Sequence, residues 1–202
     1  CMFDLILLPE HDRAPNRSNI FRTTGMLSPV TAGEKDHCKG VIMLGGVNKH
    51  FHWDNDAVAE QVTTLTAAMP QVHWQISDSP RTPATLKEKL SLPDNASLVH
   101  WRDTPDGWLS NQLATSNYVW VSADSASMVY EALSHGGRVG AIELPPYKEK
   151  NKLVRGLGLL FDKGLLGRSS HGSLELQKLN DLTLSEHTRC AQWIVAKWFA
   201  QV

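Results

Sequence analysis

Between residues 41 and 142, short apolar runs alternate with stretches of helical periodicity, and this alternation restricts the possible folds of the chain. The runs that predict strands are 41–44, 72–76, 97–101, 118–121 and 138–142. The stretches that predict helices between them include 54–69, 82–90 and 106–116. Strands without polar alternation are buried on both faces. We therefore predict an α/β fold, a Rossmann-like parallel sheet with helices on both faces.

The two ends of the chain differ from this central region. Residues 3–9 predict a strand ended by proline. Residues 11–39 are rich in Pro, Asn, Arg, Ser and Gly, which predicts a linker with little regular structure. Two further helices are predicted at 148–163 and 185–201. The chain opens on Cys1 rather than on methionine and enters an apolar strand at once, so we expect sequence upstream of it. The alternative is a short tag remnant before a natural start at Met2.

The composition is that of an ordinary globular protein, 42% hydrophobic and 20% charged over 202 residues. The net charge is −1 and no basic stripe is present, which argues against a nucleic-acid partner. No apolar run approaches the roughly 18 residues of a transmembrane segment. The three cysteines are widely spaced without a CxxC pair, which favours a reducing cytoplasm and no zinc site. We expect a cytoplasmic protein without a transmembrane segment.

The segment 119–132 is the strongest candidate for a binding site. It predicts a buried strand, a polar turn and a helix that opens on Ser125 and Ser127. The N-terminus of a helix carries free N–H groups and a partial positive charge, which suit a phosphate. Glu131 lies about one turn deeper, where its carboxylate could accept hydrogen bonds from sugar hydroxyls. The alternative is an ordinary capped helix, because any strand–loop–helix unit produces one.

Further candidates follow the first strand of the sheet, where ligands of such folds bind. Gly45 and Gly46 permit close approach of a ligand, or they form a tight turn and no more. Lys49 or His50 could lie near a phosphate. His50 and His52 share one face of an extended segment, but no third ligand has useful spacing, so no metal site is predicted.

The loop after the second strand carries Ser79 and Arg81. The arginine could pair with a phosphate through two hydrogen bonds, or it could be a solvated loop residue.

Several nucleotide and hydrolase motifs do not occur. Without a GxGxxG fingerprint or a Walker loop, binding of NAD or of a P-loop nucleotide has no support. Without a GxSxG elbow, a hydrolase triad has none either.

Four motifs occur in a fixed order along the chain: LPEHD at 8–12, LGG at 44–46 with KHF at 49–51, SPRTP at 79–83 and SADSASMVYEA at 122–132. Together they resemble the elongated-mitochondria (mitochondrial fission) family, whose bacterial members look like GT-B glycosyltransferases. The resemblance runs from about Leu5 to the final helix. It implies that this chain is the second, C-terminal domain of a GT-B protein.

The resemblance implies the following roles. A nucleotide sugar would be the donor substrate, with no cofactor and no bound metal, because the helix dipole and cationic side chains stabilise the leaving diphosphate. The glycan or lipid-linked acceptor would sit against the preceding domain. Gly45 and Gly46 would line the cleft, Ser125, Ser127 and the amide of Met128 would hold the diphosphate, and Glu131 would hold the ribose. Arg81 is the added charge partner, and Lys49, His50 and Ser79 complete the candidate donor site.

The resemblance also divides the chain. Residues 1–38 would be the end of a preceding domain plus a linker, and residues 39–202 a Rossmann-like nucleotide-sugar-binding domain. If catalysis occurs, the base lies in the preceding domain or at its edge, with His11 or Asp12 as candidates. Such an enzyme would work in the cytoplasm or at the periphery of the inner membrane.

Two departures from the family pattern and two rival functions stay open. Ala123 stands where the family often has threonine or another polar residue, and SHGGR at 134–138 replaces the more usual small-Thr-Gly-Lys-Pro turn. One rival is a non-catalytic adaptor, since plant members of the family are described as adaptors in organelle division. A sugar-nucleotide epimerase is weaker, because the dinucleotide fingerprint does not occur.

Overall fold

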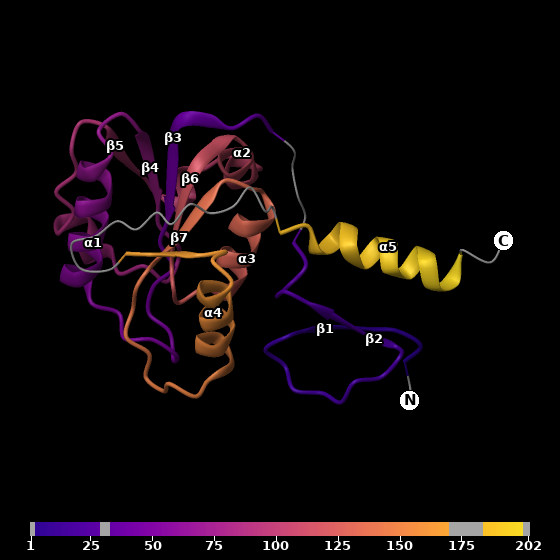
Figure 1. The fold of residues 1–202 in the computed structure, drawn as a ribbon. Helices are drawn as coiled ribbons and strands as arrows, with labels where there is room; N and C mark the ends of the chain where they lie inside the picture. Colours follow the sequence, from indigo (N-terminus) through magenta and orange to yellow (C-terminus); the bar gives the residue numbers. More distant parts are fainter. Residues whose placement is uncertain (1–2, 29–32, 170–183, 200–202) are drawn as a thin grey trace.

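A six-stranded sheet organises the molecule in the computed structural model, which describes residues 3–28, 33–169 and 184–199 (Figure 1). Its strands are β3 (Asp36–Met43), β4 (His73–Ser77), β5 (Ala96–Val99), β6 (Ser116–Ser122), β7 (Arg138–Ile142) and β8 (Gly167–Arg168). The spatial order is β5-β4-β3-β6-β7-β8, and every neighbouring pair is parallel. The predicted parallel sheet is confirmed, with strand bounds that differ from the predicted ones by a few residues.

Helices cover both faces of this sheet, as the sequence predicts. They are α1 (Asn55–Ala68), α2 (Trp108–Thr115), α3 (Ala126–Ser134) and α4 (Lys152–Asp162). Two short 3₁₀ helices, η1 (Ala84–Glu88) and η2 (Trp101–Asp103), follow β4 and β5. The predicted helix at 82–90 is thus one turn of 3₁₀ helix. In Figure 1, α1 lies on one face of the sheet and α2 and α3 lie on the other.

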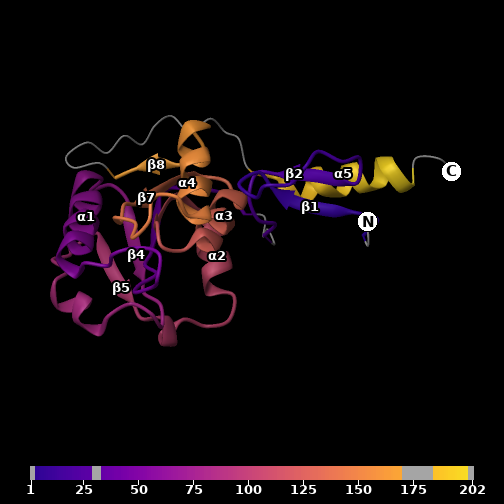
Figure 2. The ribbon, with the colours of Figure 1, turned by 90° about the horizontal axis from the view of Figure 1, so that it is seen from below.

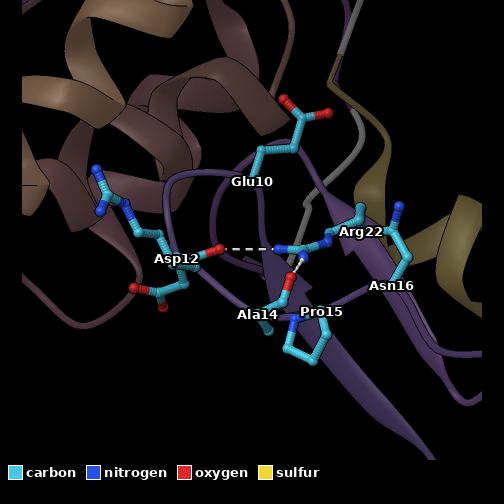
Figure 3. A pocket seen from close by; sticks show the side chains of 7 residues that line it. Glu10, Asp12, Ala14, Pro15, Asn16 and Arg22 are labelled. Carbon is cyan, nitrogen blue, oxygen red and sulfur yellow. Dashed lines mark hydrogen bonds between the residues drawn. The ribbon is translucent and has the colours of Figure 1, made fainter.

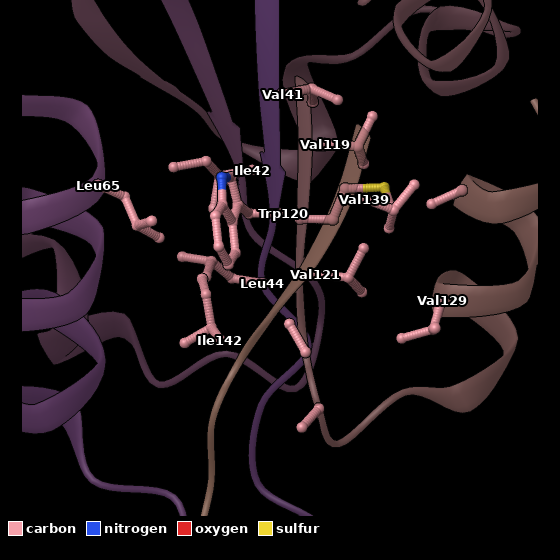
Figure 4. Close-up of a cluster of buried hydrophobic side chains, with 14 of the residues drawn as sticks. Val41, Ile42, Leu44, Leu65, Val119, Trp120, Val121, Val129, Val139 and Ile142 are labelled. Atoms are coloured by element: carbon pink, nitrogen blue, oxygen red, sulfur yellow. The ribbon is translucent and has the colours of Figure 1, made fainter. Parts of the chain in front are cut away.

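The core explains why the strands lack polar positions. Successive side chains of a strand point to opposite faces. Figure 4 shows Ile42 and Trp120 on the side of Leu65 of α1, whereas Val119 and Val121 lie on the side of α3. All of these side chains are buried. Both faces of the strands are therefore core, and alternation with polar residues would place a polar group there.

Two buried tryptophans depend on glycines in the neighbouring strands. Trp120 of β6 pairs with Gly140 of β7, and Trp74 of β4 pairs with Gly40 of β3. A Cβ atom built on Gly140 would lie 2.3 Å from the Trp120 ring, and one on Gly40 would lie 2.4 Å from the Trp74 ring. Each indole therefore occupies the space that a side chain on the adjacent strand would take.

The prediction that residues 11–39 have little regular structure was wrong in two places. Strand β2 (Ile20–Thr23) pairs in parallel with β1 (Ile6–Pro9), and β3 begins already at Asp36. Only Ile20 and Phe21 are apolar in β2, so the apolar run is too short for a periodicity argument. The first three residues of β3 are exposed, so polar side chains there stay in contact with water.

The last helix, α5 (Glu186–Trp198), packs on β2 rather than on the six-stranded sheet. The Phe21 and Trp193 rings are 4.9 Å apart, and the Arg189 guanidinium lies 4.7 Å from the centre of the Phe21 ring. Figure 2 shows β1, β2 and α5 side by side, apart from the main sheet. The helix predicted at 185–201 is confirmed as far as Trp198, and residues 200–201 lie outside the described part. The domain boundary between residues 38 and 39 stays a prediction.

Candidate functional site

The order of the strands creates a switch point at the carboxyl ends of β3 and β6 (Figure 1). The chain runs from β3 outward to β4 and β5, and then returns to β6 on the other side of β3. Ligands of open parallel sheets bind at such a point, because the two connections leave in opposite directions. Gly45 and Gly46 follow β3, and Ser125 and Ser127 follow β6. The sheet thus brings these four predicted site residues to the same edge.

Asp124 stands at the centre of this edge, and the sequence reasoning did not single it out. Its side chain is fully buried. It accepts hydrogen bonds from the Ser122 hydroxyl at 2.5 Å, the Gly46 amide at 3.1 Å and the Asn48 side-chain amide at 3.3 Å. It also forms an ion pair with Arg81, with 2.9 Å between the Arg81 Nη1 atom and Oδ2. One carboxylate therefore joins the loops that follow β3, β4 and β6.

The two glycines allow these loops to approach one another. The Gly45 amide donates to the Ser122 hydroxyl at 2.7 Å, and its carbonyl accepts from the hydroxyls of Ser79 and Thr82. A Cβ atom on Gly45 would lie 2.2 Å from an Asp124 oxygen. Gly46 has a φ of +149°, and its Cβ atom would lie 2.1 Å from the carbonyl oxygen of Arg81. The backbone amides of Gly45 and Gly46 thus donate their hydrogen bonds to Ser122 and Asp124.

The N-terminus of α3 is the second part of the edge. Ser125 occupies the N-cap position, but its side chain makes no capping hydrogen bond. Its hydroxyl lies 3.3 Å from that of Ser127, which is exposed. Met128 is half-buried. The helix has nine residues, so a partial positive charge develops at this end, where an anion would be stabilised.

Three charged side chains near this edge have unused capacity. Within the described ranges, the Glu131 carboxylate and the Lys49 ammonium form no ion pair or hydrogen bond. Arg81 is 42% exposed, and only its Nη1 atom is paired. The backbone amide of His50 donates to the Asn48 side chain. The imidazole ring of His50 has no hydrogen bond to another residue that the structure describes. The residues predicted to bind the donor substrate therefore form two groups. Gly45, Gly46 and Ser79 form hydrogen bonds within the protein, whereas the charged side chains of Glu131, Lys49 and Arg81 keep groups that are available to a ligand.

His11 and Asp12 lie against α3 and α4. Asp12 pairs with Lys152 at 2.6 Å, and the hydrogen bond from this lysine holds the pKa of the Asp12 carboxyl below its usual value. The His11 ring stacks near Tyr130 of α3, with ring centres 6.4 Å apart and planes 16° apart. The His11 carbonyl accepts from Arg155 at 3.2 Å. Of the two candidate bases, Asp12 is the one that forms an ion pair, with Lys152.

Tyr130 connects this loop to the helix that carries Ser127 and Glu131. Its ring is buried, and a Cβ atom on Gly25 would lie 1.9 Å from it. Burial raises the pKa of the Tyr130 hydroxyl to about 12. The tyrosine therefore stays neutral and acts as a packing residue between α3 and the segment that contains His11.

Hollows open near these elements. One has a volume of about 700 Å³ and is drawn in Figure 3; it is lined by Glu10, Asp12, Arg13, Ala14, Pro15, Asn16 and Arg22. Arg22 holds this loop by donating to the carbonyl oxygens of Asp12, at 2.8 Å, and Ala14. Another, about 270 Å³, lies beyond β6 and β7 between Ala123 and α4. Arg168 borders it, paired with Glu143 at 2.8 Å and stacked on Phe161.

Comparison with solved structures gives the class of the fold. A spinosyn rhamnosyltransferase, SpnG, matches with a TM-score of 0.50 and 16% identity, over 96% of this chain and 48% of that one. Cypemycin decarboxylase CypD matches with a TM-score of 0.40 and 11% identity, over 80% and 99%. The chain spans about half the length of the rhamnosyltransferase. Its fold is that of a GT-B glycosyltransferase domain, as the sequence predicts.

The family is shown by a separate comparison. The family model described as Mitochondrial fission ELM1 matches residues 1–198, and the chain belongs to this family. No curated protein matches the sequence. The resemblance found through the four motifs is therefore confirmed. No helix within the described ranges is both long and apolar enough to cross a membrane.

Proposed function

We propose that this chain is the nucleotide-sugar donor-binding half of a GT-B glycosyltransferase. The observation that carries the proposal is the uncapped N-terminus of α3 beside the switch point of the sheet. The helix dipole and first-turn amides at this point suit a diphosphate. Family membership and the GT-B fold support the same function.

In this proposal each group has a distinct task. Ser125, Ser127 and the amide of Met128 would bind the diphosphate, and Glu131 would accept hydrogen bonds from the ribose hydroxyls. Positive charge from Arg81 and Lys49 would stabilise the leaving diphosphate, so no bound metal is needed. The acceptor, a glycan or a lipid-linked molecule, would approach from the preceding domain. His11 would be the candidate base, because Asp12 is held by Lys152.

A second candidate function is that of a non-catalytic adaptor. The observation that favours it is the exposed apolar surface of the last helix, where Val195 is 55% exposed, Trp198 is 42% exposed and the adjoining Phe199 is 65% exposed. Contiguous exposed apolar side chains of this kind are typical of protein interfaces. An adaptor would need this surface and would not need Glu131.

Thermal unfolding in the presence of nucleotides separates the two candidates. We expect one of UDP, GDP, ADP or CMP to raise the melting temperature, since a ligand at a hundredfold excess over its Kd stabilises by about 2.7 kcal/mol. The shift should shrink markedly in Glu131→Ala, which removes the carboxylate that would accept hydrogen bonds from the ribose. The matched control is Glu60→Ala, a change at an exposed residue of α1, which should shift as the wild type does.

The nucleotide screen can also rule out one of the two candidate functions. If none of the four nucleotides shifts the melting temperature, donor binding by this chain is contradicted and the adaptor function is favoured. An unchanged shift in Glu131→Ala would keep nucleotide binding but remove the role of Glu131.

A further inference from the structure

We infer that Asp124 is a positioning residue that holds Arg81 at the switch point to contact the phosphates of the donor. The inference rests on the proposed function and adds to it the residue that orients the arginine. Asp124 itself cannot contact a ligand, because its side chain is fully buried. Its oxygens already accept from Ser122, Gly46 and Asn48, besides the ion pair with Arg81.

Arg81 has the opposite character. Its guanidinium is 42% exposed, and the Asp124 pair uses only the Nη1 atom. The group carries several further N–H donors in a planar fork, which suits the bidentate recognition of phosphate. Within the described ranges none of these donors has a protein partner. The free edge of the guanidinium is therefore available to an anion.

The backbone around Arg81 is also held in place. Its carbonyl oxygen accepts from the Val47 amide at 3.1 Å, and its own amide donates to the Ser79 hydroxyl at 3.2 Å. With the main chain held by these bonds and one end of the side chain held by Asp124, the guanidinium loses little further rotational freedom when it binds. Preorganised charge of this kind binds an anion more tightly than a freely rotating side chain does.

The negative charge of Asp124 matters for a second reason. A buried carboxylate needs a counter-charge, and Arg81 is the cation paired with it. In Asp124→Asn the shape of the side chain is kept while the attraction for the guanidinium is lost. Arg81 would then rotate into solvent, and phosphate binding would weaken although Arg81 itself is still present.

The test uses inorganic pyrophosphate as the probe, titrated in parallel with unphosphorylated nucleosides. We expect pyrophosphate to bind the wild type, and its affinity to fall at least about tenfold in both Arg81→Gln and Asp124→Asn, the size expected for losing a charge-assisted hydrogen bond. The double variant should bind no more weakly than either single one, because both changes remove the same contact. Affinity for the nucleoside should not change, whereas general damage to the site would lower both affinities.

A second ion pair serves as the matched control. The Asp56 carboxylate of α1 and the Lys89 ammonium, just after η1, are 2.9 Å apart, and both side chains are exposed. Asp56→Asn and Lys89→Gln should leave the affinity for pyrophosphate unchanged. Melting temperatures of all variants identify any that fail to fold.

Several outcomes would overturn the inference. Unchanged pyrophosphate affinity in Arg81→Gln would do so even if Asp124→Asn does not fold, and additive losses in the double variant would remove the role of Asp124. A wild type that binds a nucleoside diphosphate but not pyrophosphate would contradict the inference and leave the proposed function standing. A wild type that binds neither would contradict both.

Discussion

At the scale of single residues, Gly45 and Asp124 depend on each other. The carboxylate of Asp124 occupies the volume that a side chain at position 45 would need. The sequence offers two interpretations of Gly45, the close approach of a ligand or a tight turn. The structure has a carboxylate from the chain itself there, 78 positions from the neighbouring Gly46. No local pattern predicts a contact over that separation.

The first prediction follows from this contact. Gly45→Ala should lower the free energy of unfolding by about 1–3 kcal/mol, the usual cost of overpacking a buried site, because the new Cβ atom would lie 2.2 Å from the Asp124 carboxylate. Urea unfolding measures the change. The control is Gly158→Ala in α4, where no atom lies within 4 Å of the new Cβ, so that stability should stay the same or rise by up to about 1 kcal/mol. Equal stability of the two variants would contradict the packing argument.

At the scale of elements, the start of α1 follows from local side-chain chemistry. Asp54 has an extended backbone and accepts hydrogen bonds from the amides of Asp56, at 2.8 Å, and Ala57, at 3.2 Å. The sequence predicts this cap because an aspartate precedes the first residue with helical periodicity. The helix predicted at 148–163 begins only at Lys152, where Asn151 accepts from the Val154 amide at 2.8 Å. That cap lies inside a polar run, so apolar spacing alone placed the start too early.

The second prediction concerns the cap of α1. Asp54→Ala should destabilise the protein by about 1 kcal/mol, because two amides of the first turn lose their acceptor. Asp54→Asn keeps an acceptor oxygen at the same position and should cost much less. Chemical unfolding of the two variants beside the wild type measures the difference. A loss as large in Asp54→Asn as in Asp54→Ala would mean that the carboxylate charge, rather than the capping bond, stabilises the helix.

At the scale of the whole molecule, the beginning and the end of the chain meet. Glu186, at the start of α5, is almost fully buried and accepts the Thr24 amide at 2.9 Å. Arg189 contacts both carboxylate oxygens of Glu186, at 3.0 and 2.6 Å, and donates to the Arg22 carbonyl at 2.7 Å. Ion pairs of Glu10 with Lys163 and Asp12 with Lys152 tie the same early segment to α4.

The third prediction tests this docking. Glu186→Ala should speed hydrogen exchange at the amides of β2 and α5, because it removes the acceptor of Thr24 and leaves the Arg189 guanidinium without its carboxylate. Exchange in the central strand β6 should not change, since its contacts lie within the main sheet. Glu149→Ala, an exposed change, is the control. Equal protection of α5 in Glu186→Ala and in the wild type would show that the docking of the helix does not depend on Glu186.

The sequence alone determined the layered α/β fold, because apolar strands and helical periodicity are local patterns that burial on both faces of a sheet imposes. It also determined the family, because the four motifs survive in order along the chain. Only the tertiary structure decided how the edge of the sheet is built. The pairing of Arg81 with Asp124 and of Thr24 with Glu186 joins segments far apart in the sequence. Such contacts depend on strand order and loop geometry, for which single residues carry no local signal.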